Sequence, residues 1–369
     1  MKSSWIEIDR AVLRDNLQCI RGALPAATEA VLVVKANAYG HGLAETARCA
    51  AGAGVRWFAV AYLDEALAVR EAAPDAQIVV LGVADAADVP VMLERRIIPI
   101  AVSAEHGRAL GAEARRGGAR LPVHLKIDTG MGRMGILWPQ AAAEGGALLE
   151  EPGLDVQGLC THFARVEPGE QDPARVQAER FFTVAGALEA RAGRRLFRHV
   201  SSSRAMLCHP EWDLDGVRPG IIAYGYGASD ESGRVRTRPV LQWKTRVMQA
   251  RRVPAQFAVG YYGTYVTPAP TTLAVIGLGY ADGYLRTLSN KSHVLIGGRR
   301  CRVVGRVSMN WITVDVGPYG RVAQSDEVVL IGRQGNQEIW ADELATLCRT
   351  IPYEILTGIN ATIERRYLN

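Results

Sequence analysis

The chain of 369 residues has no apolar run near the roughly 20 residues that a membrane-spanning helix needs. Residues 1–9 (MKSSWIEID) also lack the apolar centre of a secretion signal. These absences argue against a membrane partner. We therefore expect the protein to stay in the cytoplasm.

The sequence also lacks the spacings that bind zinc or form a disulfide framework. Its six cysteines are scattered and show no CxxC pair, so we expect small buried thiols and no metal site. The net charge of +5 is spread over interspersed arginines and acids, with basic clusters no longer than pairs. This distribution is typical of solvated surfaces, and it argues against a nucleic-acid partner.

Lysine is scarce, because only five of the 43 basic residues are lysines. Arginine keeps its proton at every physiological pH, whereas lysine can lose it when buried. A lysine in a special position of this chain therefore indicates a need for a titratable amine.

The first two thirds of the chain alternate short apolar segments with helical ones. Eight segments read as strands, at residues 30–35, 57–61, 77–82, 97–103, 123–128, 156–162, 196–201 and 217–224. Helix-forming stretches such as 104–116 lie between them. This pattern predicts an α/β fold with an N-terminal (β/α)₈ barrel of the TIM type over residues 1–236. A doubly wound open sheet is the alternative architecture.

After residue 236 the strands follow one another without intervening helices. The expected strands are residues 240–252, 272–278, 293–296, 301–307, 311–316 and 327–332, and one late helix is expected at 341–348. The sequence thus predicts a smaller, mainly β domain over residues 237–369.

Reactive side chains gather where the predicted barrel strands end, which is where barrels of this type carry their active sites. Lys35 ends the first strand, Lys126 lies in the fifth, His162 ends the sixth and Ser203 follows the seventh. A lone lysine at a strand end is usually structural. An amine, hydroxyl groups, glycine-flanked backbone and arginine together suit a phosphorylated aldehyde cofactor held as a Schiff base.

At these residues the sequence resembles the alanine racemase family, over essentially the whole chain. Residues 33–42 (VVKANAYGHG) are similar to the segment by which that family attaches its cofactor. Further matching segments follow in family order, at residues 126–133, 161–164, 217–221, 261, 279–284, 305–309 and 351–354.

The resemblance implies that Lys35 carries pyridoxal 5'-phosphate. It places Arg218 against the pyridine nitrogen, with His162 behind it or merely buried there. Because arginine can only donate, it leaves that nitrogen unprotonated. The other residues that the resemblance implies around the cofactor are Tyr39, Leu81, Ser203, Gly220, Ile221 and Tyr353.

Lys126 is similar to a family lysine that is carbamylated. The resulting anion would orient Arg133 toward the cofactor and the substrate carboxylate. An unmodified lysine in an ion pair with an acid is the alternative, and the sequence leaves it open.

Racemisation needs one group to remove the α-proton and another to return a proton on the opposite face. The resemblance assigns these roles to Lys35 and Tyr261, and it implies that Tyr261 comes from the partner subunit of a homodimer. It also implies that Met309 of the β domain lies near the substrate carboxylate. The residues expected to line the entrance are Tyr280, Arg286 and Arg306.

Four positions depart from the usual family pattern: Ser202, Arg204, Tyr262 and Asn310. They bear on substrate choice. L-alanine and D-alanine are the expected substrates, and serine or a broader set of amino acids is the alternative, because a small pocket excludes one hydroxyl poorly. An amino-acid decarboxylase on a related barrel and a non-catalytic cofactor-binding module are weaker alternatives. The paired bases argue against the decarboxylase, and the β domain argues against the module.

Overall fold

The computed structural model describes residues 4–227, 233–317 and 322–369. They form two compact units. The barrel unit comprises Arg14–Ala38 and Leu43–Thr237, and the β unit comprises Met1–Leu13, Tyr39–Gly42 and Arg238–Asn369. The sequence-based division at residues 236 and 237 differs from this grouping, because two short segments near the N-terminus belong with the β unit.

The barrel unit is built on eight parallel strands. They are β2 (Glu29–Val33), β3 (Trp57–Val60), β4 (Gln77–Val83), β5 (Ile97–Ala101), β6 (Leu121–Asp128), β8 (Leu154–Cys160), β9 (Phe197–Ser202) and β10 (Gly216–Arg218). They pair in the order β5-β4-β3-β2-β10-β9-β8-β6, and pairing of β5 with β6 closes the ring. The closed barrel confirms the predicted fold and excludes the open sheet.

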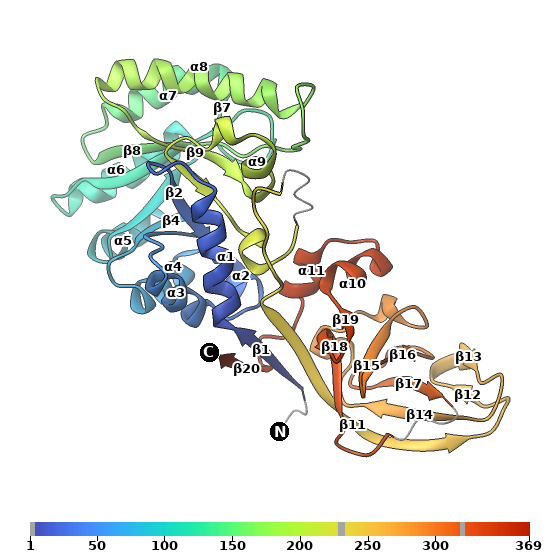
Figure 1. Cartoon of the computed structure of the whole chain (residues 1–369). Helices are drawn as coiled ribbons and strands as arrows, with labels where there is room; N and C mark the ends of the chain where they lie inside the picture. Colours follow the sequence, from blue (N-terminus) through green and yellow to red (C-terminus); the bar gives the residue numbers. More distant parts are fainter. Residues whose placement is uncertain (1–3, 228–232, 318–321) are drawn as a thin grey trace. The chain divides into compact units, whose positions relative to one another are not determined.

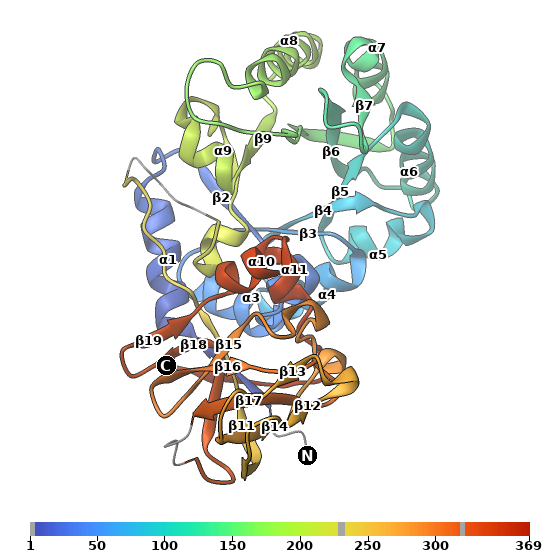
Figure 2. The ribbon, with the colours of Figure 1, turned by 90° about the vertical axis from the view of Figure 1, so that its right-hand side faces the viewer.

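Helices cover the outside of this ring, as Figure 2 shows for α4 to α8. The helices of this part of the chain are α1 (Arg10–Gly22), α3 (Leu43–Gly52), α4 (Leu63–Ala72), α5 (Val89–Glu94), α6 (Ala104–Arg116), α7 (Trp138–Leu149), α8 (Ala174–Ala192) and α9 (Ser203–Cys208). Short elements are the left-handed turn α2 (Lys35–Tyr39), β7 (Ile136–Leu137) and the 3₁₀ turns η1 (Ala86–Asp88), η2 (Pro210–Trp212) and η3 (Ile221–Tyr224).

The last barrel strand is shorter than predicted. The strand expected at residues 217–224 ends at Arg218, and Ile221–Tyr224 form the 3₁₀ turn η3 instead. Pro219 has no N–H to donate to a neighbouring strand, so pairing stops there. The first strand likewise ends at Val33, before Lys35 enters a left-handed turn.

The β unit contains a mixed sheet whose edge was not anticipated. Strand β1 (Trp5–Asp9) pairs antiparallel with β11 (Leu241–Val253) and parallel with β20 (Glu364–Leu368). The remaining strands and helices, labelled in Figure 1, are β12 (Ala258–Val259), β13 (Tyr265–Val266), β14 (Thr271–Ile276), β15 (His293–Ile296), β16 (Arg299–Val303), β17 (Ile312–Gly317), β18 (Glu327–Gln334), β19 (Gln337–Ile339), α10 (Ala341–Cys348) and α11 (Pro352–Thr357). The 3₁₀ turns of this unit are η4 (Tyr261–Gly263), η5 (Tyr280–Asp282) and η6 (Arg286–Leu288). A mainly β C-terminal domain is confirmed.

Within the described ranges, the helices are all too short or too polar to cross a membrane.

Candidate active site

Lys35 begins a turn of left-handed helix directly after β2. Four consecutive non-glycine residues, Ala36 to Tyr39, have φ between 52° and 54°. Each such residue costs roughly 1–2 kcal/mol, so the surrounding structure must hold the turn. The Glu65 carboxylate accepts the Ala36 amide at 2.6 Å and the Ala61 amide at 2.8 Å, which anchors the start of the turn.

The amine of Lys35 is half-buried and lies among cations. Burial lowers the pKa of Lys35, and the positive charges of Arg133 and Arg218 lower it further, against an opposing effect of Glu65. A lowered pKa increases the fraction of free amine near neutral pH. The free amine is the form that acts as a base or nucleophile.

Arg218 is buried at the end of β10, where it makes several hydrogen bonds. It donates to the carbonyl oxygens of Thr161 at 2.7 Å and Val200 at 3.0 Å, and to Nδ1 of His199 at 3.0 Å. His162 Nδ1 lies 3.4 Å from the same guanidinium. Burial and the charge of Arg218 lower the pKa of His162 to about 2, so this imidazole is neutral.

Ser203 and Gly220 come together at the starts of two short helical elements. Ser203 begins α9, and its hydroxyl oxygen accepts the Gly220 amide at 3.0 Å. Ile221 follows in the buried start of η3. The Ser203 hydroxyl keeps its own proton to donate, and a helical start that presents such a donor is suited to an anion such as phosphate.

Lys126 is buried inside the barrel, and no acidic side chain of the described residues forms an ion pair with it. The carboxylate of nearby Asp128 binds backbone amides instead of the Lys126 amine. It accepts the amides of Gly130 and Met131, each at 2.9 Å. Burial lowers the pKa of Lys126 to about 8, and the charges of Arg218 and Arg133 contribute. Around Lys126, burial and positive charge thus outweigh the opposing effect of Asp128.

Leu81, in β4, packs on the buried cluster formed by Val79, Ile98, Ile100 and Cys160, together with Met134. It therefore adds an apolar side chain to the barrel wall.

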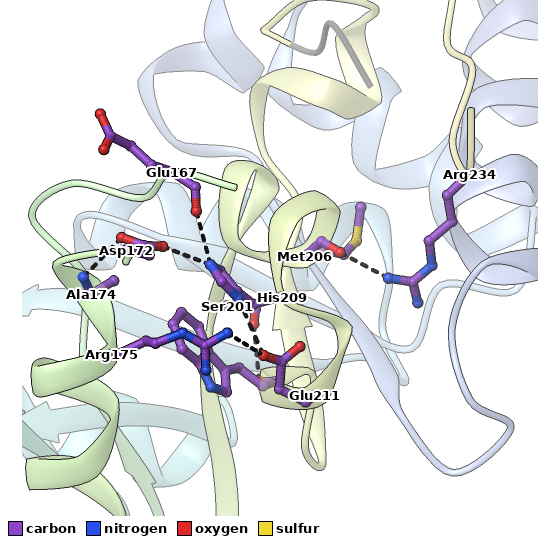
Figure 3. A network of polar contacts seen from close by, with 10 residues as sticks. Glu167, Asp172, Ala174, Arg175, Ser201, Met206, His209, Glu211 and Arg234 are labelled. Atoms are coloured by element: carbon purple, nitrogen blue, oxygen red, sulfur yellow. Dashed lines mark hydrogen bonds and ion pairs between the residues drawn. The ribbon is translucent and has the colours of Figure 1, made fainter. Parts of the chain in front are cut away.

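His209 ties two loops of the barrel unit together (Figure 3). Its Nε2 lies 2.7 Å from the Asp172 carboxylate and 2.9 Å from the Glu167 carbonyl oxygen, and its Nδ1 lies 3.2 Å from Glu211. His209 follows α9, whereas Glu167 and Asp172 belong to the loop after His162. The contact therefore holds the segments that begin at Ser203 and His162 against each other.

The β unit brings Tyr39 and Tyr353 together. Their ring centroids are 5.8 Å apart, and the rings are inclined by 53°. Burial raises the pKa of Tyr353, so the phenol remains a hydrogen-bond donor at neutral pH. Gly40 allows this packing, since a Cβ there would lie 2.4 Å from the Leu356 carbonyl oxygen.

Other β-unit candidates surround the segment 305–309. Tyr261 lies at the tip of the β12–β13 hairpin, where a Cβ on Gly260 would approach the Arg306 amide to 3.3 Å. The Tyr280 amide donates to the Ser308 carbonyl oxygen at 3.0 Å, next to Met309. Tyr261 and Met309 are 67% and 55% exposed. Arg286 is also exposed, and it begins η6. Ser289 follows η6, and its hydroxyl oxygen accepts the Val307 amide at 2.9 Å.

The unusual Tyr262 occupies a backbone conformation that favours glycine, with φ of 63°. Its ring lies under the Arg306 guanidinium, 4.4 Å from centroid to Cζ, and 86% of the residue is exposed. Ser202 is the N-cap of α9, and Asn310 is exposed. The chemical groups of the site are thus unchanged by these departures.

The sequence reasoning did not identify Glu65 and His199. Glu65 lies on a helix, and its role depends on a contact with a turn 29 residues away. His199 could have been found from the two-residue period of β9, which places it on the same strand face as Ser201.

Comparison with known proteins decides the family. The profiles of the alanine racemase N-terminal and C-terminal domains match residues 8–228 and 240–367. The chain belongs to the alanine racemase family. The alanine racemase of Desulfosudis oleivorans is 41% identical, over 100% of this chain and 97% of that protein. The predicted resemblance is confirmed.

Solved structures of the family agree in fold. Alanine racemase from Bacillus anthracis with bound L-Ala-P superposes with a TM-score of 0.92 at 32% identity, covering 100% of this chain and 96% of that one. The Bartonella henselae enzyme with covalently bound pyridoxal phosphate gives 0.87 at 28% identity, covering 100% of both chains. The family depends on pyridoxal phosphate.

Proposed function

We propose that this protein is a pyridoxal-phosphate-dependent racemase that interconverts L-alanine and D-alanine. One observation carries the proposal. A strained turn anchored by Glu65 presents the amine of Lys35, with its lowered pKa, near the guanidinium groups of Arg133 and Arg218. The family assignment over the full chain supports the same reaction.

The barrel residues fit the cofactor by charge and by donor type. Four positive charges lower the pKa of His162, those of Lys35, Lys126, Arg133 and Arg218. An anionic group is therefore favoured among them. Lys35 would hold the cofactor covalently, Arg218 would donate to its ring nitrogen, and Ser203, Gly220 and Ile221 would bind its phosphate. The other residues proposed to surround the cofactor are Tyr39, Leu81, His162 and Tyr353. When bound, the cofactor withdraws electron density from the α-carbon, which makes the α-proton removable.

Two bases on opposite faces account for inversion. The amine of Lys35 takes or returns the α-proton on one face, and the phenol of Tyr261 does so on the other. The substrate carboxylate is held by Arg133 and by the backbone at Met309.

We further propose that Tyr261 and Met309 act on the barrel of a second copy of the chain. Exposed apolar side chains at one surface mark an interaction site. Those of the β unit at this surface are Tyr261, Tyr262, Tyr280, Met309 and Trp311. Tyr280, Arg286 and Arg306 would then line the entrance for the amino acid. In this arrangement each site needs two chains, and the monomer is inactive.

Carbamylation of Lys126 would supply the missing negative charge beside Arg133 and Arg218. Only the neutral amine attacks CO₂, and with a pKa of about 8 its share rises as the pH increases through 8. With ¹³C-bicarbonate at pH 8.5, a carbamate resonance should appear in the wild type and in Lys291→Ala, but not in Lys126→Ala. Turnover of Lys126→Ala should fall about 10- to 100-fold, because Arg133 loses its orientation. Equal spectra for all three proteins would contradict the carbamate.

Serine is the alternative substrate, and the full-length relatives, which are alanine racemases, do not favour it. Tyr262 and Asn310, next to Tyr261 and Met309 in the sequence, are the departures that bear on it. A decarboxylase and a non-catalytic module are not favoured by the family match over both domains.

Hydrogen exchange in D₂O separates these functions. L-alanine, L-serine and L-lysine are offered separately, and products are followed by NMR and chiral chromatography. We expect deuterated D-alanine to form fastest. Exchange confined to serine or lysine would show another specificity, release of CO₂ would show a decarboxylase, and cofactor binding without any exchange would show a module.

A further inference from the structure

A cavity opens at the end of the barrel opposite Lys35, where the strands begin. Its volume is about 610 Å³. Trp57 and Phe197, the first residues of β3 and β9, line it together with His124 of β6. Three arginines, Arg120, Arg191 and Arg194, also line it. None of these residues has a part in the proposed reaction.

A chain of hydrogen bonds leads from Arg218 to this cavity. Arg218 can only donate, so Nδ1 of His199 is the acceptor of their 3.0 Å bond and carries no proton. Nε2 of His199 lies 3.0 Å from Nδ1 of His124. Burial keeps both imidazoles neutral, by holding the pKa of His124 near 3 and that of His199 well below its usual value. His199 therefore donates from Nε2, and the proton of His124 is on its own Nε2.

His124 lines the cavity, and its N–H is a fixed donor that is buried behind the cavity surface. Nε2 of His124 is buried and has no hydrogen-bond partner among the described residues. A buried donor without an acceptor destabilises the folded protein, so an acceptor at this point stabilises it. The barrel is shaped to hold the ring, since a Cβ on Gly158 would lie 2.7 Å from Cδ2 of His124.

The walls offer a flat aromatic surface and positive charge. Trp57 and Phe197 stack with centroids 4.6 Å apart and planes inclined by 5°. Three arginines and two acids, Glu150 and Asp155, line the cavity, which leaves one net positive charge. Arg194 contacts Asp155 at 3.0 Å in an exposed pair. Arg194 also donates to the Val156 carbonyl oxygen at 2.8 Å, which holds the guanidinium at the cavity. Exposed ion pairs contribute little to stability, so the contact with Asp155 can give way to an incoming anion.

We propose that this cavity binds a small planar carboxylate. One carboxylate oxygen accepts the Nε2 proton of His124 once the side chains that cover this atom shift aside. The guanidinium of Arg194 neutralises the charge, and the flat part of the ligand lies on Trp57. A second part rests on the proposed function: through His124 and His199, the bound anion alters the hydrogen bond that Arg218 donates to the cofactor nitrogen. Because coupling is reciprocal, the cofactor then alters the affinity of the carboxylate by the same factor.

Benzoate is the probe, and the holoenzyme is labelled with ¹⁵N-histidine. Alanine at saturating concentration keeps benzoate from the catalytic end. We expect a saturable shift of the His124 Nε2 resonance in the wild type and in Arg48→Gln, a matched loss of an exposed, ion-paired arginine. Affinity should fall about tenfold or more in Arg194→Gln, since the variant loses a hydrogen bond between two charged groups. Cyclohexanecarboxylate, which is not planar, should bind more weakly.

Two outcomes would overturn the site. One is an unchanged His124 resonance in a large excess of benzoate, which would show that the carboxylate does not reach Nε2. The other is equal affinity in wild type and Arg194→Gln. Neither outcome depends on the cofactor. Repeating the titration with cofactor-free protein therefore tests benzoate binding separately from the proposed function. To test the coupling, the absorbance of the bound cofactor is followed. Benzoate should shift it in the wild type but not in Arg194→Gln. An unshifted spectrum, although the His124 resonance shows that benzoate binds, would overturn the coupling.

Discussion

Replacing Lys35 with alanine should abolish racemisation in both directions. Lys35 is the proposed covalent anchor and the base for one face, so no substrate isomer can complete inversion without it. General acid–base catalysis alone contributes about 10²–10⁴-fold, and the lost attachment adds to this, so we expect a fall of about 10⁴-fold or more. The measurement is D-alanine formation from L-alanine, and the reverse, by chiral chromatography.

The matched control is Lys291→Ala, because Lys291 is an exposed lysine of the β unit. It should retain wild-type turnover. Borohydride followed by peptide mapping should place the cofactor on Lys35 in the wild type and in the control. Methylamine added to Lys35→Ala should restore part of the turnover, because it supplies an amine to the emptied space. Attachment at Lys126, or undiminished turnover of Lys35→Ala, would contradict the assignment.

The barrel was predictable because its strands are buried on both faces and therefore read as apolar runs. Their ends were less predictable, since they depend on single residues such as Pro219, which has no N–H to continue pairing. The sequence pattern did not predict strand β1, for a different reason. It is five residues long, and its parallel partner β20 lies at the other end of the chain.

Sequence patterns could not predict the left-handed turn that begins at Lys35. Alanine favours right-handed helix, yet Ala36 and Ala38 lie in a left-handed turn. Tertiary contacts outweigh local preference there, since Glu65 accepts the Ala36 amide and Asn37 Oδ1 accepts the Leu43 amide at 2.8 Å. Motif similarity identified Lys35, but the way in which it is held became visible only in the structure.

The buried histidines show the same limit. Strand periodicity places His124 and Lys126 on one face of β6, but it does not reveal which neighbouring strand faces them. The bond between His124 and His199 joins residues 75 positions apart, and it depends on how the barrel closes.

Replacing Tyr261 with phenylalanine should retain the cofactor and its colour but remove most racemisation. The substitution deletes only the hydroxyl group, so the exposed hairpin tip should keep its shape. Loss of one acid–base group corresponds to about 10²–10⁴-fold. We expect the larger effect on removal of the proton from L-alanine, the face that Tyr261 is proposed to serve.

Exchange in D₂O distinguishes this role from a structural one. With Lys35 intact, Tyr261→Phe should still exchange the α-proton of D-alanine with retention, while inversion to L-alanine is slow. A structural defect would instead slow exchange and inversion equally. Tyr262→Phe is the matched control, because it removes a hydroxyl from the adjacent exposed ring and leaves the face under Arg306 intact. If both variants lost exchange from the two isomers in the same proportion, the opposite face would belong to another group, and Tyr261 would serve only the packing of the hairpin.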